Sequence, residues 1–575
     1  MGLLRLLSRY RTKITQSCHP YDSANRPSTL SWPRAISTPQ SQNASNWDDE
    51  SFYRYTGGRW LFNEDKQMAD RSVRFNMTEL VRAAAISQGC DISSCIKVEK
   101  LPEGDYNKVF LISLHGGHEV VAKVPNKNAG LPFYTTASEA ATMNFGRNVA
   151  GLPIPKVYVW NPHTSDNHVG AEYIIMEKAR GVLLSSKWPS MKRDQKINLI
   201  NTVISLEKSL LTHNFQHIGS LYHKSDLNGV QDRNRFLVTS YGDFFVGPST
   251  ERNFVYDGRR AVNTDKGPWN SALEYILASS TRERECIVRG LGFPRPEGIF
   301  GGPGGYKPTA KSKLDVLDDF EKVAAYLLPK DTSIHIPVLW HGDLHDNNIF
   351  VDPDDPSKIL SIIDWQTTHI APLFQQARTP EFLDFIGPHP SVGLTPMPPL
   401  PDNFDSLSPA EKEEAEKLQS KQSLFKIYEI QSGRNNMPVF KALQHSQTLV
   451  IQIISLISQV FNDGEPIIKG QLIQLALDWE KVVGPNGHPC PLQFTEADVA
   501  AQRVDQQKWE EGIQMKGDVL EALGGSEHGW AGWSSHEDYD VLTKKLAVVK
   551  EQFLEYMANN EAEKEAWENE QRNIV

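Results

Sequence analysis

The stretch that decides the fold is "HGDLHDNNIFVDPDDPSKILSIIDW", which runs from His341 to Trp365. Its first eight residues include two His, two Asp and two Asn, and two apolar runs follow, "IFV" and "KILSII". Short β-branched runs separated by a turn rich in Asp and Pro predict a β-hairpin. Such a hairpin brings Asn348, at its beginning, close to Asp364, at its end.

The polar groups of this stretch have the layout that phosphoryl transfer requires. In that reaction a carboxylate orients the acceptor hydroxyl, and magnesium held on oxygen ligands neutralises the charge of the phosphates. We therefore predict that Asp343 is catalytic and that Asn348 and Asp364 hold Mg2+ beside the phosphates of ATP. His341 is better explained as a structural residue that holds the loop, and the role of His345 stays open.

The motif "HGDLHxxN" followed by "IIDW" resembles the aminoglycoside phosphotransferase and choline kinase group, relatives of the protein kinases. The resemblance implies an α+β, bilobal, protein-kinase-like fold with a small antiparallel-sheet N-lobe and a larger, mostly helical C-lobe with insertions. It also implies ATP and Mg2+ as cofactors and an alcohol group as the phosphate acceptor. More narrowly, "FYRYTGGRWLFNE", "ASEAATMNF" and "GPSTERNF" resemble a fungal, mitochondrial branch of this group.

By the same resemblance, segments upstream supply the other parts of a nucleotide site. "VVAKV" offers Lys123 as the strand lysine that pairs with the α- and β-phosphates, and "SEAATMNF" offers Glu139, sixteen residues later, as its helix partner. "IIMEKARG" resembles the segment between the lobes, where the backbone of Glu177 and Lys178 meets adenine. Lys123 alone would be an ordinary surface lysine, and only its position before Glu139 favours a functional role.

The turn that should cover the phosphates departs from the kinase pattern. "LPEGDYNKVF" has one glycine, Gly104, where protein kinases carry three, so we predict that the amide of Asn107 replaces backbone contacts. A weak phosphate clamp keeps a second hypothesis open, a catalytically inactive nucleotide-binding protein with the same fold. A third hypothesis, a metal hydrolase built on His341, Asp343 and His345, lacks further His or Cys clusters nearby.

The pattern of strands and helices predicts the two lobes. Residues 46–178 are expected to form the N-lobe, with a helix that begins at Thr136 or Ser138 and strands at "CIKVEK", Asn107 to Leu114, Glu119 to Val124, "PIPKVYVW" and "AEYIIMEK". Residues 179–480 are expected to form the helical C-lobe, with insertions at about 240–310 and 388–425.

Two further helical segments are predicted. In the second insertion, Ser408, Pro409 and Glu411 form a helix-capping set, so the charged run that follows them is a solvated helix. Residues 481–575 are predicted to be a helical extension, and "DYDVLTKKLAVVKEQFLEYMANNEAEKEAWENEQ" within it a single long helix.

The first residues predict where in the cell the protein is located. "MGLLRLLSRYRTKITQSCHPY" is basic, has no acidic residue before Asp22, and has its apolar positions interrupted by Arg5 and Arg9. This composition resembles a mitochondrial transit peptide, and a disordered basic tail is the alternative. Residues 1–45 are therefore interpreted as transit peptide and linker, recognised by the mitochondrial import machinery and directing the protein to the mitochondrial matrix.

Composition excludes several other classes. The chain has 575 residues and a net charge of −11, which argues against nucleic acid as a ligand, because phosphate-backbone binding needs a basic surface. The five cysteines are too scattered for a disulfide framework. The most apolar run, Leu449 to Phe461, is shorter than the roughly 20 residues that span a bilayer, so it predicts a buried helix and no transmembrane segment. The sequence thus predicts a mitochondrial small-molecule kinase whose hydroxyl acceptor it does not identify.

Overall fold

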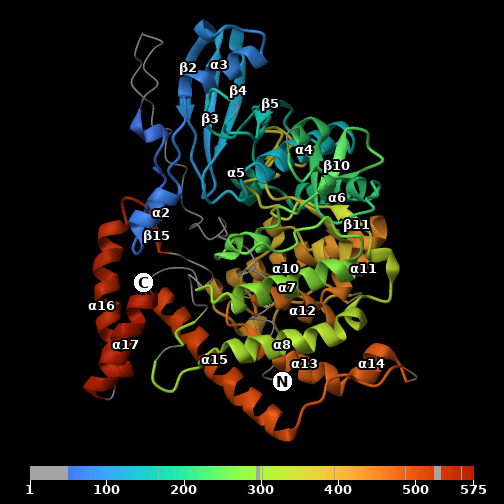
Figure 1. Ribbon diagram of the computed structural model, residues 1–575, viewed down its shortest axis with the longest axis vertical. Coiled ribbons are helices and arrows are strands. Elements are labelled where there is room, and N and C mark those ends of the chain that lie inside the picture. The colour runs from blue at the N-terminus through green and yellow to red at the C-terminus, as the bar shows by residue number, and fades with distance from the viewer. Residues whose placement is uncertain are drawn as a thin grey trace.

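The computed structural model describes residues 49–165, 167–228, 230–292, 298–300, 302–393, 395–485, 487–523, 532–558 and 560–574. The predicted transit peptide and linker, residues 1–45, lie outside the described residues. The chain folds into a small lobe built on a sheet and a larger, mainly helical lobe, and Figure 1 shows the sheet above the helices. The predicted α+β, bilobal, kinase-like fold is confirmed.

The N-lobe is a five-stranded antiparallel sheet in which the predicted strands all occur. Its order is β2 (Cys95–Lys100), β3 (Asn107–Leu114), β4 (Glu119–Pro125), β6 (Tyr173–Glu177) and β5 (Val157–Asn161). Burial alternates along β3, as expected for side chains that point to opposite faces of a strand. The face that carries Phe110 and Ile112 packs against helix α3 (Met77–Ser87) and forms the core of this lobe.

Helix α4 (Tyr134–Asn148) lies between the lobes and begins earlier than predicted. Its N-terminus is set by Phe133, whose backbone N–H donates to the carboxylate of Glu172 at 2.8 Å. The Thr136 hydroxyl donates to the same carboxylate and therefore does not cap the helix. The prediction that the helix begins at Thr136 or Ser138 was wrong, because the acid that fixes its start comes from a distant part of the chain.

An apolar cluster joins the two lobes below the sheet. It combines Phe145 from α4 and Ile174 from β6 with residues of the C-lobe, among them Leu221, Ile362 and Trp365. All five side chains are nearly or fully buried. Since this cluster includes Trp365, the packing between the lobes also fixes the segment that contains Asp364.

The C-lobe is built from helices that surround one large apolar core. Its main helices are α6 (Arg193–Leu211), α7 (Ala272–Val288), α8 (Ala310–Val323), α10 (Pro409–Asn435), α11 (Met437–His445), α12 (Leu449–Leu456) and α13 (Glu465–Leu477). Between them lie a three-stranded sheet and shorter elements: β8 (Ser220–His223), β9 (Leu237–Val238), β10 (Phe244–Gly247), α5 (Leu184–Lys187), β11 (Pro337–Leu339), β14 (Ile370–Pro372), α9 (Leu373–Gln376) and α14 (Trp479–Val483).

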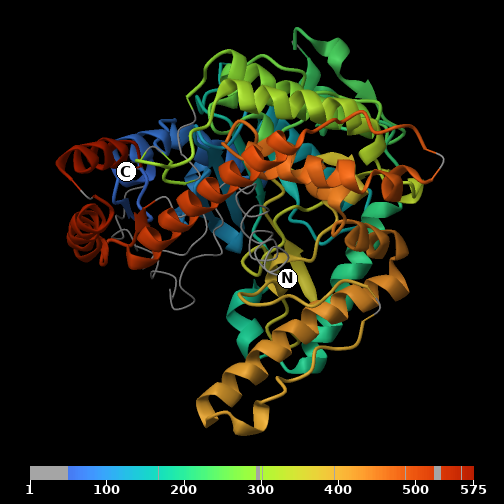
Figure 2. The ribbon, with the colours of Figure 1, turned by 90° about the horizontal axis from the view of Figure 1, so that it is seen from below.

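Two predicted helices of the C-lobe can be compared with the structure. The Ser408 side chain accepts from the Glu411 N–H and Glu411 accepts from the Ser408 N–H, so the predicted capping box starts α10, which extends away from the body of the lobe in Figure 2. The apolar run from Leu449 is buried as predicted, but it continues after α12 as a 3-10 turn, Ile457–Gln459.

The C-terminal residues return to the N-lobe. Strand β15 (Trp533–Ser534), which follows helix α15 (Glu496–Leu523), pairs antiparallel with β1 (Arg59–Trp60). The next helix along the chain, α16 (Tyr539–Met557), lies beside α2 (Glu64–Asp70), the helix that follows β1 (Figure 1). Gly58 permits this close approach, because a Cβ atom there would lie 2.5 Å from the Ser534 carbonyl oxygen. The single long terminal helix was predicted wrongly: the chain forms α16 (Tyr539–Met557) and α17 (Glu561–Ile574).

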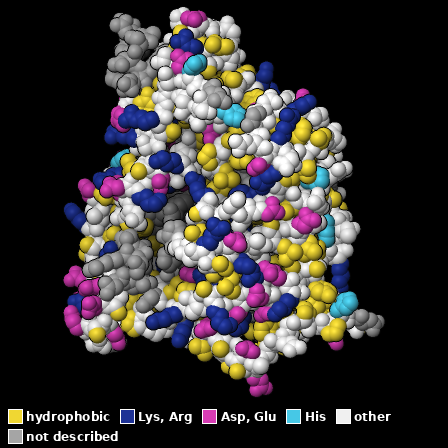
Figure 3. All heavy atoms as spheres, viewed as in Figure 1, with side chains coloured by type: hydrophobic (Ala, Val, Ile, Leu, Met, Phe, Trp, Pro, Cys, Tyr) yellow, Lys and Arg dark blue, Asp and Glu magenta, His cyan; other side chains and the backbone are white. Residues whose placement is uncertain are grey.

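Charge and hydropathy follow the pattern of a globular fold. On the face shown in Figure 3, basic and acidic side chains are interspersed over both lobes. Among the described residues, no helix combines the length and the apolar character that crossing a membrane requires.

A buried acid on α6 gives the C-lobe a pH-dependent stability. Burial raises the pKa of Glu207 from 4.5 to about 8, although the Tyr428 hydroxyl donates to it at 2.9 Å. Folding therefore favours the protonated acid, so this stabilisation is complete below pH 4.5 and is lost as the pH rises through 8. Glu207→Gln should remove a slope of about 1.4 kcal/mol per pH unit over that interval.

The measurement is the thermal midpoint of wild type and variant between pH 5 and pH 9. We expect Glu207→Gln to unfold at a higher temperature than wild type at the alkaline end. Glu413→Gln, on the exposed face of α10, serves as the control and should leave the profile unchanged. Parallel profiles for Glu207→Gln and wild type would contradict the assignment.

Candidate active site

The hairpin that carries two of the predicted site residues is present. Strands β12 (Ile349–Val351) and β13 (Ile359–Ile362) pair antiparallel, with Ile349 opposite Ile362. Beyond the strands, the Ile363 N–H donates to the Asn348 carbonyl oxygen at 3.0 Å. The hairpin therefore places Asn348 beside the backbone that leads into Asp364, as its sequence predicts.

Lys123, on β4 of the N-lobe, forms ion pairs both within its own lobe and with the C-lobe. Its ammonium Nζ lies 2.6 Å from Glu139 Oε1 on α4 and 3.3 Å from Asp364 Oδ1 of the C-lobe. Lys123 and Glu139 are buried. Burial lowers the pKa of Lys123, but the two carboxylates outweigh burial, so the pKa is raised and the side chain stays charged. The structure thus brings together three of the predicted site residues.

Asp364 adopts a backbone conformation that non-glycine residues rarely use. Its φ angle is 62°, in the left-handed region, which costs free energy and persists only where the surroundings impose it. This turn directs the carboxylate toward Lys123 as soon as β13 has ended. Burial raises the pKa of Asp364, but the positive charges of Lys123 and Arg252 outweigh burial, and the pKa is lowered overall.

The loop before the hairpin is held by hydrogen bonds of its own. His341 Nε2 donates to the Ile363 carbonyl oxygen at 2.9 Å, and its Nδ1 accepts from the Asp343 N–H at 3.3 Å. The Asn348 amide Nδ2 donates to the Asp343 carbonyl oxygen at 2.9 Å. These bonds fix Asp343 relative to Asn348. Because both ring nitrogens of His341 are engaged, the histidine is structural, and burial lowers its pKa, which keeps the ring neutral.

The donor atoms around Asp364 suit a magnesium ion. The Asn348 nitrogen is used by the loop, so its oxygen Oδ1 is the atom left for a cation, and Asp364 supplies a carboxylate. Mg2+ is commonly bound by one or two protein oxygens together with substrate phosphates and water. Among the described residues, no group of three or more His, Cys, Asp or Glu side chains forms a complete metal site. Asn348 and Asp364 thus fit an ion that arrives with a phosphate ligand.

Comparison with known proteins decides the family. Residues 304–375, which include the loop, the hairpin and Asp364, match the phosphotransferase enzyme family. A subtelomeric hrmA-associated cluster protein of Aspergillus fumigatus is 30% identical over 460 residues, which cover 75% of this chain and 88% of the relative. The chain belongs to the phosphotransferase enzyme family.

Other relatives of this chain are less similar to it. Altered inheritance of mitochondria protein 9, mitochondrial, of Yarrowia lipolytica is 22% identical, with 80% of this chain and 82% of the relative covered. A structure of a streptomycin–ATP–APH(2'')-IIa ternary complex is 14% identical, with a TM-score of 0.33, and 66% of this chain and 91% of that chain are covered.

The other residues predicted to meet the nucleotide lie at the start of β3 and at the end of β6. The Asn107 amide, at the start of β3, donates to Gln366 Oε1 at 2.7 Å and so joins the phosphate-covering turn to the segment after Asp364. At the end of β6, the Glu177 N–H donates to the Lys156 carbonyl oxygen at 2.8 Å. The exposed side chain of Lys178 pairs with Glu119 at 2.7 Å, so Lys178 can meet a nucleotide base only through its backbone.

The turn predicted to cover the phosphates is held by the buried Glu103, which the sequence did not reveal. Glu103 is buried and accepts from Lys108 at 2.7 Å, from Lys100 at 2.9 Å and from the Thr56 N–H at 2.6 Å. Hydrogen bonds to Glu103 therefore fix this turn, which has one glycine. A Cβ atom at Gly104 would meet nothing within 4 Å.

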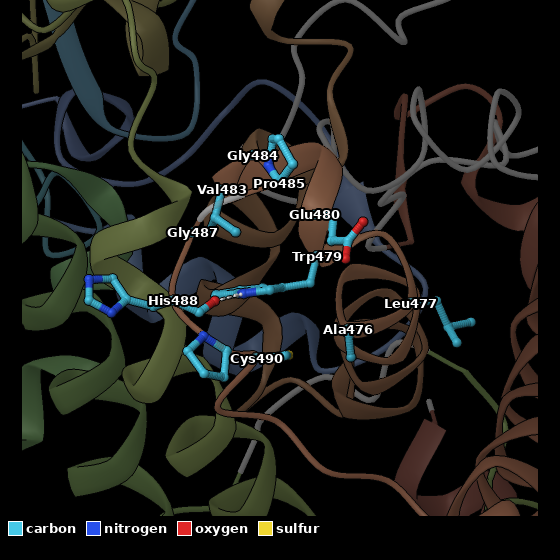
Figure 4. A pocket seen from close by; sticks show the side chains of 11 residues that line it. Ala476, Leu477, Trp479, Glu480, Val483, Gly484, Pro485, Gly487, His488 and Cys490 are labelled. Atoms are coloured by element: carbon cyan, nitrogen blue, oxygen red, sulfur yellow. Dashed lines mark hydrogen bonds between the residues drawn. The ribbon is translucent and has the colours of Figure 1, made fainter.

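A separate open cavity of about 380 Å³ lies in the C-lobe, away from this cleft (Figure 4). It is formed by the end of α13, by α14 and by the loop that follows. The Trp479 indole N–H donates to the His488 carbonyl oxygen at 2.7 Å across it. The predicted site residues are not among the residues that line this cavity.

Proposed function

We propose that this protein is an ATP-dependent phosphotransferase that transfers the γ-phosphate to a hydroxyl group of a small molecule. The single observation that carries the proposal is the contact of Lys123 with both Glu139 and Asp364. It places an ammonium from the N-lobe against the acid that ends the hairpin of the C-lobe. Membership of the phosphotransferase family supports it.

The residues of the cleft are assigned the following roles. Lys123, held by Glu139, binds the α- and β-phosphates, and the backbone near Glu177 and Lys178 meets adenine. Asn348 and Asp364 hold Mg2+, which when bound neutralises charge on the phosphates. The Asp343 carboxylate accepts a hydrogen bond from the acceptor hydroxyl and orients its oxygen toward the terminal phosphorus. Positioning and electrostatics supply most of the rate gain in this chemistry.

We also propose where the reaction takes place and how the chain is divided. Residues 1–45 act as a transit peptide and linker, 46–178 as the nucleotide-binding lobe, 179–480 as the catalytic lobe, and 481–575 as an extension that binds back to the N-lobe. The basic start of the chain and relatives named as mitochondrial proteins support a location in the mitochondrial matrix.

The test is a labelling experiment with full-length protein. ATP labelled on its γ-phosphate is incubated with a mitochondrial metabolite extract, with Mg2+ in one arm and with a chelator in the other. We expect a labelled small molecule that requires both protein and Mg2+. If calorimetry shows that MgATP binds and yet no extract fraction is labelled, transfer is excluded for the metabolites present.

One observation favours a second candidate, an inactive nucleotide-binding protein. The Asn107 amide, expected to contact phosphate, already donates to Gln366. In this candidate the cleft binds MgATP without transfer. Binding of MgATP by a protein that neither hydrolyses it nor labels any metabolite would support it.

A further inference from the structure

Arg252 is a cation of the cleft that the proposed function does not use. It begins a 3-10 turn, Arg252–Phe254, in the predicted insertion of the C-lobe. Its guanidinium carbon lies 4.6 Å from the ring centroid of Tyr106, which belongs to the phosphate-covering turn. The other ring near it, Tyr256, stacks on Tyr106 with centroids 6.0 Å apart and planes 8° apart. The arginine thus lies beneath the turn of the opposite lobe.

The guanidinium of Arg252 has no acid paired with it. Within the described ranges, no carboxylate lies at ion-pair distance from it, and its Nε is buried without a hydrogen-bond partner. The buried arginines of the same lobe and of the N-lobe differ in this respect. Arg259 pairs with Glu283 at 2.9 Å, and Arg71 pairs with Asp105 at 2.9 Å. A half-buried cation with unused donors in a cleft is suited to an anionic ligand.

Arg252 also belongs electrostatically to the site. Burial lowers the pKa of its guanidinium, but interaction with the oxygens of Tyr106, Tyr256, Asp343 and Asp364 outweighs burial, and the pKa is raised. The two phenols are uncharged near neutral pH, because burial raises the pKa of each, so the negative field that acts there comes from the two carboxylates. The side chain of Arg252 is therefore charged, and it interacts electrostatically with Asp343, the proposed catalytic acid, and with Asp364, the acid that ends the hairpin. Between those two acids is where a terminal phosphate must lie to meet an acceptor.

The loop that presents Arg252 is braced rather than free. The preceding residue, Glu251, accepts from the Tyr275 hydroxyl at 2.6 Å and from the Asn253 amide at 3.0 Å. One residue earlier, the Thr250 N–H donates to the Ser220 hydroxyl at 2.9 Å. A braced loop places a charge without the loss of conformational entropy that a mobile loop would incur.

We propose that Arg252 binds the terminal phosphate of a nucleoside triphosphate, so that the cleft distinguishes triphosphate from diphosphate. This inference rests on the proposed function, because it assumes that a nucleotide enters the cleft. Lys123 is already paired with Glu139 and Asp364, whereas Arg252 has no carboxylate at ion-pair distance among the described residues. Its planar set of donors matches the oxygens of a phosphate.

The experiment compares two probes that need no acceptor. Calorimetry with full-length protein and Mg2+ measures the affinity for ADP and for the β,γ-imido analogue of ATP. We expect Arg252→Met to lower the affinity for the triphosphate analogue about 10- to 100-fold, because a hydrogen bond to a charged group is lost. The affinity for ADP should change by less than about twofold. Arg252→Lys keeps the positive charge but loses the planar set of guanidinium donors. Its affinity for the triphosphate analogue should lie between those of wild type and Arg252→Met.

The other outcomes are equally informative. If Arg252→Met lost equal affinity for both nucleotides, Arg252 would support the turn through Tyr106. If the affinity for neither nucleotide changed, Arg252 would face another ligand. Each of these results would overturn the inference. Arg233→Met, an exposed arginine in the segment that precedes this insertion, is the control and should bind like wild type. If wild type binds neither nucleotide, the proposed function fails, whereas a failure confined to the Arg252 variants leaves that function intact.

Discussion

Asp343→Asn is expected to lower labelling of the acceptor by about 10²- to 10⁴-fold, the contribution typical of a general base. The substitution keeps the size of the side chain but removes the negative charge that accepts the hydroxyl proton. The two bonds that fix this loop use the backbone of Asp343: its N–H donates to His341 and its carbonyl accepts from Asn348. The fold of the loop should therefore survive.

The measurement is the rate of formation of the labelled product, together with the calorimetric affinity for MgATP. We expect the affinity for MgATP to stay within about twofold of wild type, since Asp343 is assigned to the acceptor and not to the nucleotide. Asp354→Asn, in the turn of the same hairpin, is a matched control that should retain full activity. If Asp343→Asn formed the labelled product at the wild-type rate, Asp343 would have no role in the reaction.

Lys123→Met should affect both nucleotide binding and stability. It removes the ammonium that we assign to the α- and β-phosphates, so the affinity for MgATP should fall about 10- to 100-fold. It also leaves Glu139 buried and close to Asp364 with no cation between them. Removing one partner from a buried ion pair typically costs about 3 to 5 kcal/mol of the free energy of unfolding.

Calorimetry measures the first effect and thermal unfolding the second. Lys97→Met, on the exposed edge strand β2 of the same sheet, removes a lysine that pairs with Glu99, two residues away. It should change the free energy of unfolding by less than about 0.5 kcal/mol and leave binding unaltered. A Lys123→Met protein that binds MgATP like wild type would contradict the assigned role of this lysine.

Local patterns predicted those elements whose cause is local. Strand β3 begins at Asn107 and ends at Leu114 as expected, because alternating apolar residues and a Gly-Gly turn are contained in the segment itself. The capping box at Ser408 also acts within one turn of helix. The start of α4 was misplaced because its determinant, Glu172, is distant in sequence.

The same distinction holds for the site. The order of Lys123, Glu139 and Asp364 along the chain was enough to predict that they lie together, because their spacing resembles a known motif. The catalytic role of Asp343 and the metal-binding role of Asn348 stay predictions. Arg252 and Gln366 were missed, since each acquires its place only when segments from both lobes meet: Arg252 under Tyr106, and Gln366 beside Asn107. A single arginine or glutamine in a loop carries no local signal of such a meeting.

The sequence by itself determined the hairpin after His341, the five strands of the N-lobe and the contact of Lys123 with Glu139. Only the tertiary structure decided how the phosphate-covering turn is held and how the C-terminal strand β15 pairs with β1. The physical reason is that hairpins and caps are stabilised by neighbours along the chain. Pairing between distant segments depends instead on the burial and charge that the folded lobes create together.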